Sequence, residues 1–147
     1  MKKLLFVFTL LAASFTFIAC SDDDDEKTIG MNELPTNAKS FLETHFPGQE
    51  ANRVEKDNDG YDVYLKNGFS IDFTLDGEWD DVDGNTQDLP QSIIDLLPAK
   101  IAEYIQTNYL DETIREINKE KFGFEVDLSN RVELEFDSEG NFLRVDK

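Results

Sequence analysis

The chain has 147 residues, and its 32 Asp and Glu against 14 Lys and Arg give a formal net charge of −18. Such a polyanion has no sequence-independent attraction for nucleic acid, because that binding depends on Lys and Arg that neutralise phosphates. One Cys and one His exclude a disulfide framework, a thiolate zinc cluster and a histidine-based metal site. A hydrophobic content of 39% nevertheless predicts a folded chain, of a length that fits one domain.

The N-terminus predicts an export signal. Two lysines precede an apolar run over residues 4–19, which is shorter than the roughly 20 residues of a membrane span. We interpret residues 1–19 as a signal peptide. Cys20, directly after Ala19, resembles the lipidated Cys of a bacterial lipobox, and the alternative is a cleaved secretory signal with an incidental Cys.

An acidic run opens a predicted tether over residues 20–33. Its first residues resemble the acidic export signal that some Gram-negative bacteria place after a lipidated Cys, and they are Ser21, Asp22, Asp23 and Asp24. The other interpretation is a solvated spacer, because like charges repel and keep a chain extended. We expect an outer-membrane lipoprotein, surface-exposed or else facing the periplasm, that contacts the membrane through its N-terminal lipid only.

A unit of fifty residues occurs twice, over residues 34–83 and 97–146. With a constant offset of 63 residues, the copies are identical at 12 of 50 positions, where chance gives roughly three. A unit of this size buries too small a fraction of its surface to be comfortable alone. We therefore expect residues 34–147 to form one duplicated domain.

Each unit is predicted to open with a helix. In the first unit, apolar residues at helical spacing follow Pro35, and Pro47 and Gly48 end the helix. The equivalent helix of the second unit follows Pro98. Residues 89–96 are expected to add a short helical turn between the units.

The rest of each unit alternates with period two and is punctuated by Gly, which predicts an antiparallel β-meander. A three-residue loop would pair Leu65 with Phe69 and keep the apolar side chains on one face, with Gly68 at positive φ. The equivalent of Gly68 is Arg131, which we expect either to carry backbone strain or to bend the loop. The predicted fold is α+β, with both helices on one face of a shared antiparallel sheet.

Two strand segments carry a resemblance to a known family. VEKDNDGYDVYLKNGFSIDFTLDGEWDDVD and INKEKFGFEVDLSNRVELEFDSEGNFLRVD, each preceded by a Leu-Pro helix, resemble the PepSY-like, β-lactamase-inhibitor-like (BLIP-like) family of small secreted bacterial lipoproteins. The resemblance covers residues 34–146 and implies a duplicated α+β fold without catalytic residues or cofactor. The inhibitor label describes fold, and fold does not confer function.

One loop resembles a metal-binding motif. Residues 55–60 place acids at positions 1, 3 and 5 of an EF-hand pattern and Gly at 6, but Lys66 occupies position 12, where a bidentate Glu is required. We interpret this loop as a turn. The single His45 is interpreted as structural or solvated, so we predict no enzyme, no metal ligands and no cofactor.

Charge concentrates on one predicted hairpin. Its register sets Asp127 opposite Glu133 and Glu125 opposite Glu135, and opposed like charges destabilise a sheet. Either Arg144 and solvent screening absorb the repulsion, or the face binds a basic protein, a polycation or divalent ions.

We expect weaker charge repulsion in the equivalent hairpin of the first unit. Asp62 lies opposite Asp72, but Tyr64 lies opposite Ser70, and Tyr64 is expected to be an exposed aromatic that adds affinity for a partner.

The sequence favours a non-enzymatic envelope lipoprotein with a protein-binding module, an inhibitor-like role being one form of it. The candidate binding face consists of Glu125, Asp127, Glu133, Glu135 and Tyr64. The expected partner is an unidentified envelope or extracellular protein, in the simplest case a basic one. The alternative is binding of calcium or a small cationic ligand by the acidic sheet face. The third possibility is a hydrolase that uses carboxylates alone. It ranks last, because it would need two acids converging in a cleft, whereas these acids are predicted on an open sheet face.

Overall fold

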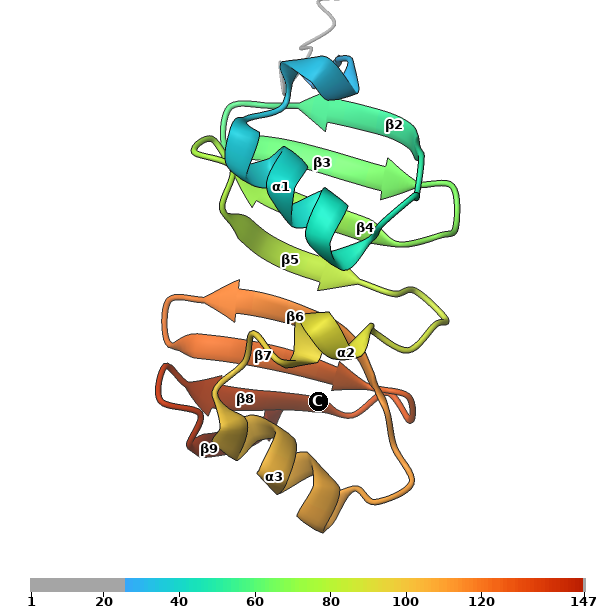
Figure 1. Ribbon diagram of the computed structural model, residues 1–147. Coiled ribbons are helices and arrows are strands. Elements are labelled where there is room, and N and C mark those ends of the chain that lie inside the picture. The colour runs from blue at the N-terminus through green and yellow to red at the C-terminus, as the bar shows by residue number, and fades with distance from the viewer. Residues whose placement is uncertain (1–25, 147) are drawn as a thin grey trace, which may run out of the picture.

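The computed structural model describes residues 26–146, so the predicted signal peptide, Cys20 and the acidic export signal lie outside the described residues. One antiparallel sheet contains nine strands. Successive strands lie side by side in the order of the chain (Figure 1). The strands are β1 (Lys27–Thr28), β2 (Ala51–Lys56), β3 (Gly60–Leu65), β4 (Ser70–Thr74), β5 (Trp79–Asp83), β6 (Ile114–Glu120), β7 (Gly123–Leu128), β8 (Glu133–Asp137) and β9 (Phe142–Asp146).

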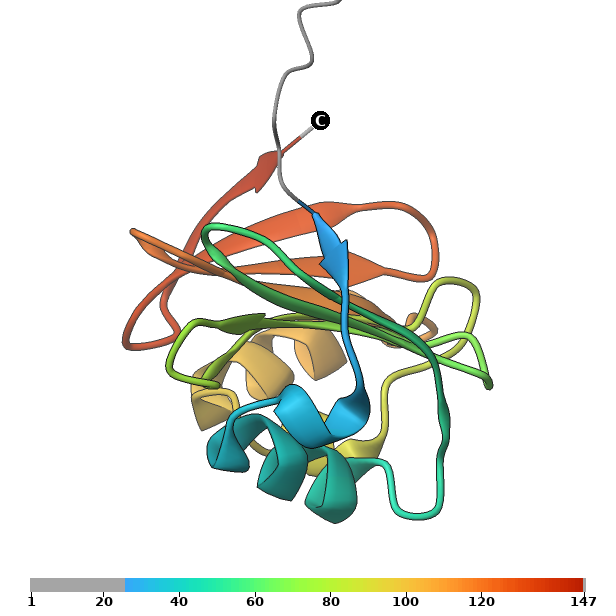
Figure 2. The ribbon, with the colours of Figure 1, turned by 90° about the horizontal axis from the view of Figure 1, so that it is seen from above.

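The helices all lie on one face of the sheet, as the view from above shows (Figure 2). They are α1 (Thr36–His45), α2 (Gln91–Ile94) and α3 (Ala99–Asn108), preceded by the 3-10 turn η1 (Met31–Glu33). The predicted short helical turn between the units is α2, and α1 ends before Pro47 as expected. The prediction of an α+β fold with helices on one face of a shared sheet is confirmed.

The duplication is visible in the packing of aromatic rings. Phe41 of α1 meets Phe73 of β4 edge to face with 5.6 Å between ring centroids. At the same positions of the second unit, Tyr104 meets Phe136 edge to face at 5.5 Å. Aromatics at helical spacing therefore belong to the core in both units.

A row of apolar side chains crosses the sheet under the helices and joins the units. Its members face one another across successive strands, and they are Val54, Val63, Ile71, Val82, Ile117, Val126 and Leu134. Val82 of β5 pairs with Ile117 of β6, and both are completely buried. Each such side chain contributes about 1.5–3 kcal/mol through burial, so the β5–β6 junction makes one core out of two units.

The hairpin loops follow the predicted register. Val63 pairs with Ile71, and the Leu65 amide donates to the Phe69 carbonyl at 2.8 Å. Gly68 has a φ of 99°, and its equivalent Arg131 has a φ of 67°. Arg131 therefore adopts the left-handed conformation of its glycine equivalent, a region that is costly for most residues with a Cβ.

We expect Arg131→Gly to raise the free energy of unfolding by about 0.5–1 kcal/mol, because Gly adopts positive φ without steric cost. Gly68→Ala is the matched control, since it introduces a Cβ at the equivalent position and should lower stability. Urea denaturation of both variants measures the two effects. Destabilisation by Arg131→Gly would show that this loop tolerates the left-handed residue through contacts of its side chain.

Candidate functional site

The sheet face opposite the helices carries two rows of mostly acidic side chains, which we call the acidic face. Paired residues of antiparallel strands point to the same side, so the register defines each row. The first row consists of Glu55, Asp62, Asp72, Asp81, Asn118, Glu125, Glu135 and Arg144. The second row consists of Arg53, Tyr64, Ser70, Asp83, Glu116, Asp127, Glu133 and Asp146.

In the second unit, the opposed pairs form as predicted, with Asp127 opposite Glu133 and Glu125 opposite Glu135. Arg144 of β9 then binds Glu135 with two hydrogen bonds, Nε to Oε2 at 2.8 Å and Nη2 to Oε1 at 2.6 Å. Glu135 is only 5% exposed, so this bidentate contact satisfies a buried carboxylate. One of the four predicted face carboxylates therefore already has its cation.

The expectation of an exposed Tyr64 is wrong. The guanidinium of Arg53 lies 4.2 Å from the centre of the Tyr64 ring, and the ring is half-buried. Arg53 comes from the adjacent strand β2. A cation over the face of an aromatic ring is a favourable contact. Tyr64 is thus a platform for Arg53 and not a free aromatic anchor.

The hairpin of the first unit pairs as predicted, with Asp62 opposite Asp72 and Tyr64 opposite Ser70, but the next strand adds a further acid. The 63-residue offset makes Asp81 the equivalent of Arg144, so Asp72 has Asp62 on one side and Asp81 on the other. Burial, and then the charge of Asp62, raises the pKa of Asp72 to about 6. The position that supplies a cation in the second unit supplies another acid here.

The most strongly perturbed carboxyls lie where the two units meet. Burial, and then the charge of Glu116, raises the pKa of Asp81, and burial raises that of Glu116. Burial, and then Glu133, raises the pKa of Asp127 to about 6. Asp81 Oδ2 and Asp127 Oδ1 are buried without a hydrogen-bond partner. Carboxylates in this state favour a bound proton or another cation.

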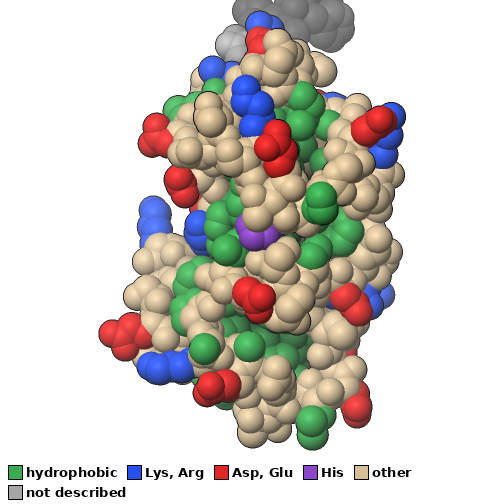
Figure 3. Space-filling model, in the orientation of Figure 1, with side chains coloured by type: hydrophobic (Ala, Val, Ile, Leu, Met, Phe, Trp, Pro, Cys, Tyr) green, Lys and Arg blue, Asp and Glu red, His purple; other side chains and the backbone are tan. Residues whose placement is uncertain are grey.

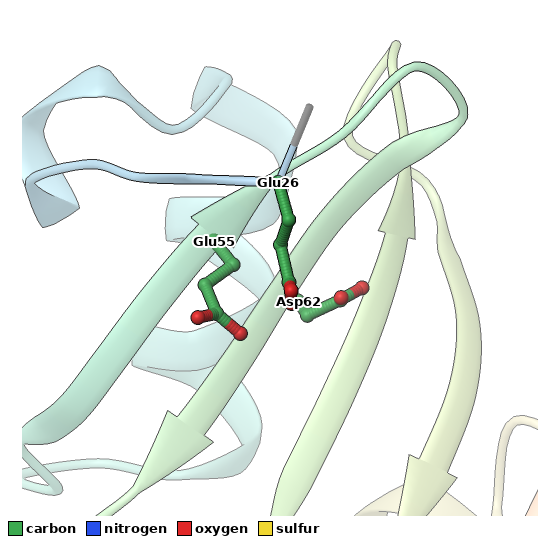
Figure 4. Close-up of side chains that lie close together, drawn as sticks. All are labelled: Glu26, Glu55 and Asp62. Carbon is green, nitrogen blue, oxygen red and sulfur yellow. The ribbon is translucent and has the colours of Figure 1, made fainter. Parts of the chain in front are cut away.

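Among the described residues, two clusters of three carboxylates each are close enough for the members of a cluster to share one ion. In each, one oxygen per residue lies within 4.8 Å of the others, and the groups are Glu26, Glu55 and Asp62 (Figure 4), and Glu125, Glu133 and Asp146. Oxygens bound to one calcium ion at about 2.4 Å lie no more than about 4.8 Å apart. Both groups therefore satisfy this distance requirement.

Sequence reasoning missed Glu26 and Glu55 as neighbours. The sequence predicts Glu26 in the tether, whereas β1 brings it to the edge of the sheet beside β2. The sequence predicts Glu55 in a loop motif, whereas it lies inside β2 and points to the open face. The alternation of buried Val54 with Glu55 was the available signal for that orientation.

The loop after β2 is a turn, as predicted. Asp57 Oδ1 accepts hydrogen bonds from the backbone amides of Asp59 and Gly60, each at 2.7 Å. This is the local bonding by which Asp favours turns.

The helix face offers no comparable cluster in residues 26–146. Figure 3 shows hydrophobic side chains beside the single histidine. The His45 ring packs against the Phe41 ring in a tilted arrangement with centroids 4.5 Å apart, and burial lowers the pKa of His45. His45 is therefore placed as a packing residue at the end of α1.

A hollow of about 310 Å³ beside α2 and α3 contains two carboxylates, those of Asp88 and Glu112. Asp88 pairs with Arg115 at 3.0 Å and accepts a hydrogen bond from Thr113. Glu112 accepts a hydrogen bond from the hydroxyl of Ser129. Both groups are engaged, so they do not form the free acid pair that carboxylate-based hydrolysis requires.

The chain matches the family described as "putative beta-lactamase-inhibitor-like, PepSY-like" over residues 23–72 and 59–144. It belongs to this family, and the resemblance drawn from the sequence is confirmed. No curated protein matches the chain.

Three solved structures share the fold with TM-scores of 0.77. A "putative calcium-regulated periplasmic protein" from Bacteroides thetaiotaomicron is 34% identical over 84% of this chain and 98% of its own. A "putative periplasmic protein" from Bacteroides vulgatus is 33% identical over 85% and 99%. A "putative periplasmic protein of unknown function" from the same species is 27% identical over 83% and 99%.

The relatives support a periplasmic or envelope location for this chain, and nothing in them indicates catalysis. Within residues 26–146, no helix combines the length and the apolar character needed to cross a bilayer.

We expect the metal-free protein to lose stability as pH rises from 5 to 8. Raised pKa values at Asp72, Asp81, Glu116 and Asp127 mean that the folded chain binds more protons than the unfolded chain in this range, so the free energy of unfolding falls with pH. The melting temperature, measured in a chelator at low salt, should fall by about 5 °C or more.

Asp81→Asn should flatten this profile and raise the melting temperature at pH 8, since it removes the most strongly perturbed charge of the acidic face. The exposed Asp111→Asn is the control and should leave the profile unchanged. If the melting temperature depended on pH equally in the wild type and in Asp81→Asn, Asp81 would not be a cause of that dependence.

Proposed function

We propose that this chain is a non-enzymatic cell-envelope protein whose acidic face binds cations, with calcium as the ligand. The observation that carries the proposal is the pair of carboxylate rows, which run across both units and contain only two cationic residues, Arg53 and Arg144. Bringing these acids together costs free energy through repulsion between neighbours. A bound cation offsets that cost.

The chemistry of the face favours calcium among common cations. Its donors are carboxylate oxygens, which are hard ligands that suit calcium and magnesium, and neither row contains His or Cys. Calcium accepts six to eight oxygens in flexible geometry, whereas magnesium demands a near-ideal octahedron. The sheet sets the backbone positions of these carboxylates on neighbouring strands, and such an arrangement suits the flexible shell of calcium better than the strict octahedron of magnesium.

The comparison supports this ligand. The similar protein from Bacteroides thetaiotaomicron is called calcium-regulated, and the likeness extends over 84% of this chain. We carry calcium over to this chain as a proposal.

The proposed place of action is the cell envelope, with the protein held there by a lipid on Cys20. The support is the lipobox-like Ala19-Cys20 junction, followed by Ser21 to Asp24, together with periplasmic relatives. Surface display would expose the face to millimolar extracellular cations, the range in which extracellular calcium modules work.

Calcium at about 5 mM should raise the melting temperature at pH 7.5 by about 5 °C, because a ligand that binds only the folded state stabilises it. The gain should shrink at pH 5, where protons compete for the raised-pKa carboxyls. Magnesium chloride and sodium chloride at matched ionic strength are the controls. An unchanged melting temperature in calcium at pH 7.5 would remove the proposed function.

The second candidate function is binding of a basic protein by the same face. The specific observation is that the face runs uninterrupted across β2 to β9 and no helix of residues 26–146 covers it (Figure 2). Membership of an inhibitor-like family is a further support.

Cross-linking in native envelopes, with Asp72→Asn plus Asp83→Asn as the comparison, tests this second candidate. We expect the wild type to retain a basic partner that the double variant loses, with retention that weakens as salt rises. Recovery of the same proteins by both chains would count against a role of the acidic face in protein binding.

A further inference from the structure

Few interactions hold the N-terminal strand β1 to the sheet. Lys27 pairs with Lys56 and Thr28 with Glu55, and the Ile29 amide donates to the Val54 carbonyl at 2.9 Å. Both residues of β1 are exposed. Two ladder pairs and one flanking hydrogen bond give a short, solvent-exposed strand little stability of its own.

The charges around β1 oppose its docking. Lys27 faces Lys56 directly, and directly opposed like charges destabilise a strand pair. On the open side, Glu26 lies against Glu55 and Asp62, with carboxylate oxygens of all three within 4.8 Å of one another. The three groups come from three segments of the chain, and Figure 4 shows their side chains next to one another. Docking of β1 therefore creates a carboxylate cluster that the separated segments do not have.

Glu55 is the member of the cluster that a bound cation would stabilise most. It is only 7% exposed, and its Oε2 is buried without a hydrogen-bond partner. Its other oxygen, Oε1, lies 3.3 Å from Arg53, whose guanidinium is also held over Tyr64. A buried carboxylate oxygen without a partner carries a desolvation cost that a metal ion removes.

The surroundings leave room to complete a coordination shell. A surface hollow lined by Glu26, Asp57, Asn58 and Asp59 adjoins the cluster through Glu26. Water in this hollow can supply the further oxygens that calcium needs beyond three carboxylates.

We propose that a calcium ion bound by Glu26, Glu55 and Asp62 fastens β1 to the edge of the sheet. The inference rests on the proposed function and deepens it by naming a site and what occupancy of that site controls. The ion replaces repulsion among three carboxylates by attraction, and it links the segment before β1 to β2 and β3. Calcium thereby determines whether the N-terminal segment is docked on the domain.

The Ile29 amide reports docking directly, because its hydrogen bond to Val54 exists only when β1 is in place. Hydrogen exchange followed by NMR at pH 7.5 compares the protein with and without calcium chloride. Calcium should slow exchange of this amide by about tenfold or more, as a shift in a local opening equilibrium does. Magnesium chloride at matched ionic strength should have a smaller effect.

Glu55→Gln and Asp62→Asn should each abolish the calcium-dependent slowing at Ile29. The matched control is Glu125→Gln plus Glu133→Gln, which alters the other carboxylate group and leaves β1 untouched. This control should keep the slowing at Ile29. Both test variants must retain the slow exchange of the Ile117 amide in the core, because that exchange shows that the variant is folded.

The outcomes separate the inference from the function on which it rests. If calcium raises the melting temperature but leaves Ile29 exchange unchanged, the docking site is wrong while cation binding by the face stands. If the control variant loses the slowing at Ile29 as fully as Glu55→Gln does, the effect is global and the site is overturned. If calcium changes neither measurement, both proposals fail.

Discussion

The pairing of β5 with β6 is the contact on which the rest of the molecule depends. Val82 and Ile117 meet there with no exposed surface, and the ladder that holds them continues the sheet from one unit into the next. Each fifty-residue unit by itself would leave one strand edge and much of its apolar row open to water. The junction removes those two edges at once and gives both helices a common layer to cover.

The same alternation that builds the core also determines the chemistry of the opposite face. Every apolar residue that points to the helices has neighbours in its strand that point to solvent, and in this chain most of those are acids. Apolar burial on one side has to outweigh charge repulsion on the other. The second unit reduces the repulsion through Arg144, whereas the first unit has Asp81 at the equivalent place and keeps it.

Much of the fold followed from the sequence, because the hairpins have local signals. The alternation of apolar residues and the Gly68 loop were enough to give the register of β3 with β4, and the 63-residue offset carried that register to β7 and β8. The sequence did not predict that the two rows of the acidic face continue across both units. This continuity depends on how β5 pairs with β6 and on the irregular pairing near Phe73. The exposure of Tyr64 was mispredicted because Arg53 reaches it from another strand.

The spacing of the rows has an electrostatic consequence of its own. Neighbouring strands lie about 4.8 Å apart, so where both rows are acidic the face presents about one carboxyl group per 2.4 Å, compared with one phosphate charge per 1.7 Å of duplex DNA. Such a row attracts protons and other cations together, because the raised pKa values keep part of its carboxyls protonated near neutral pH. The acidic face is therefore a short polyelectrolyte within a folded protein, and the ions around it exchange according to their valence and to the salt of the medium.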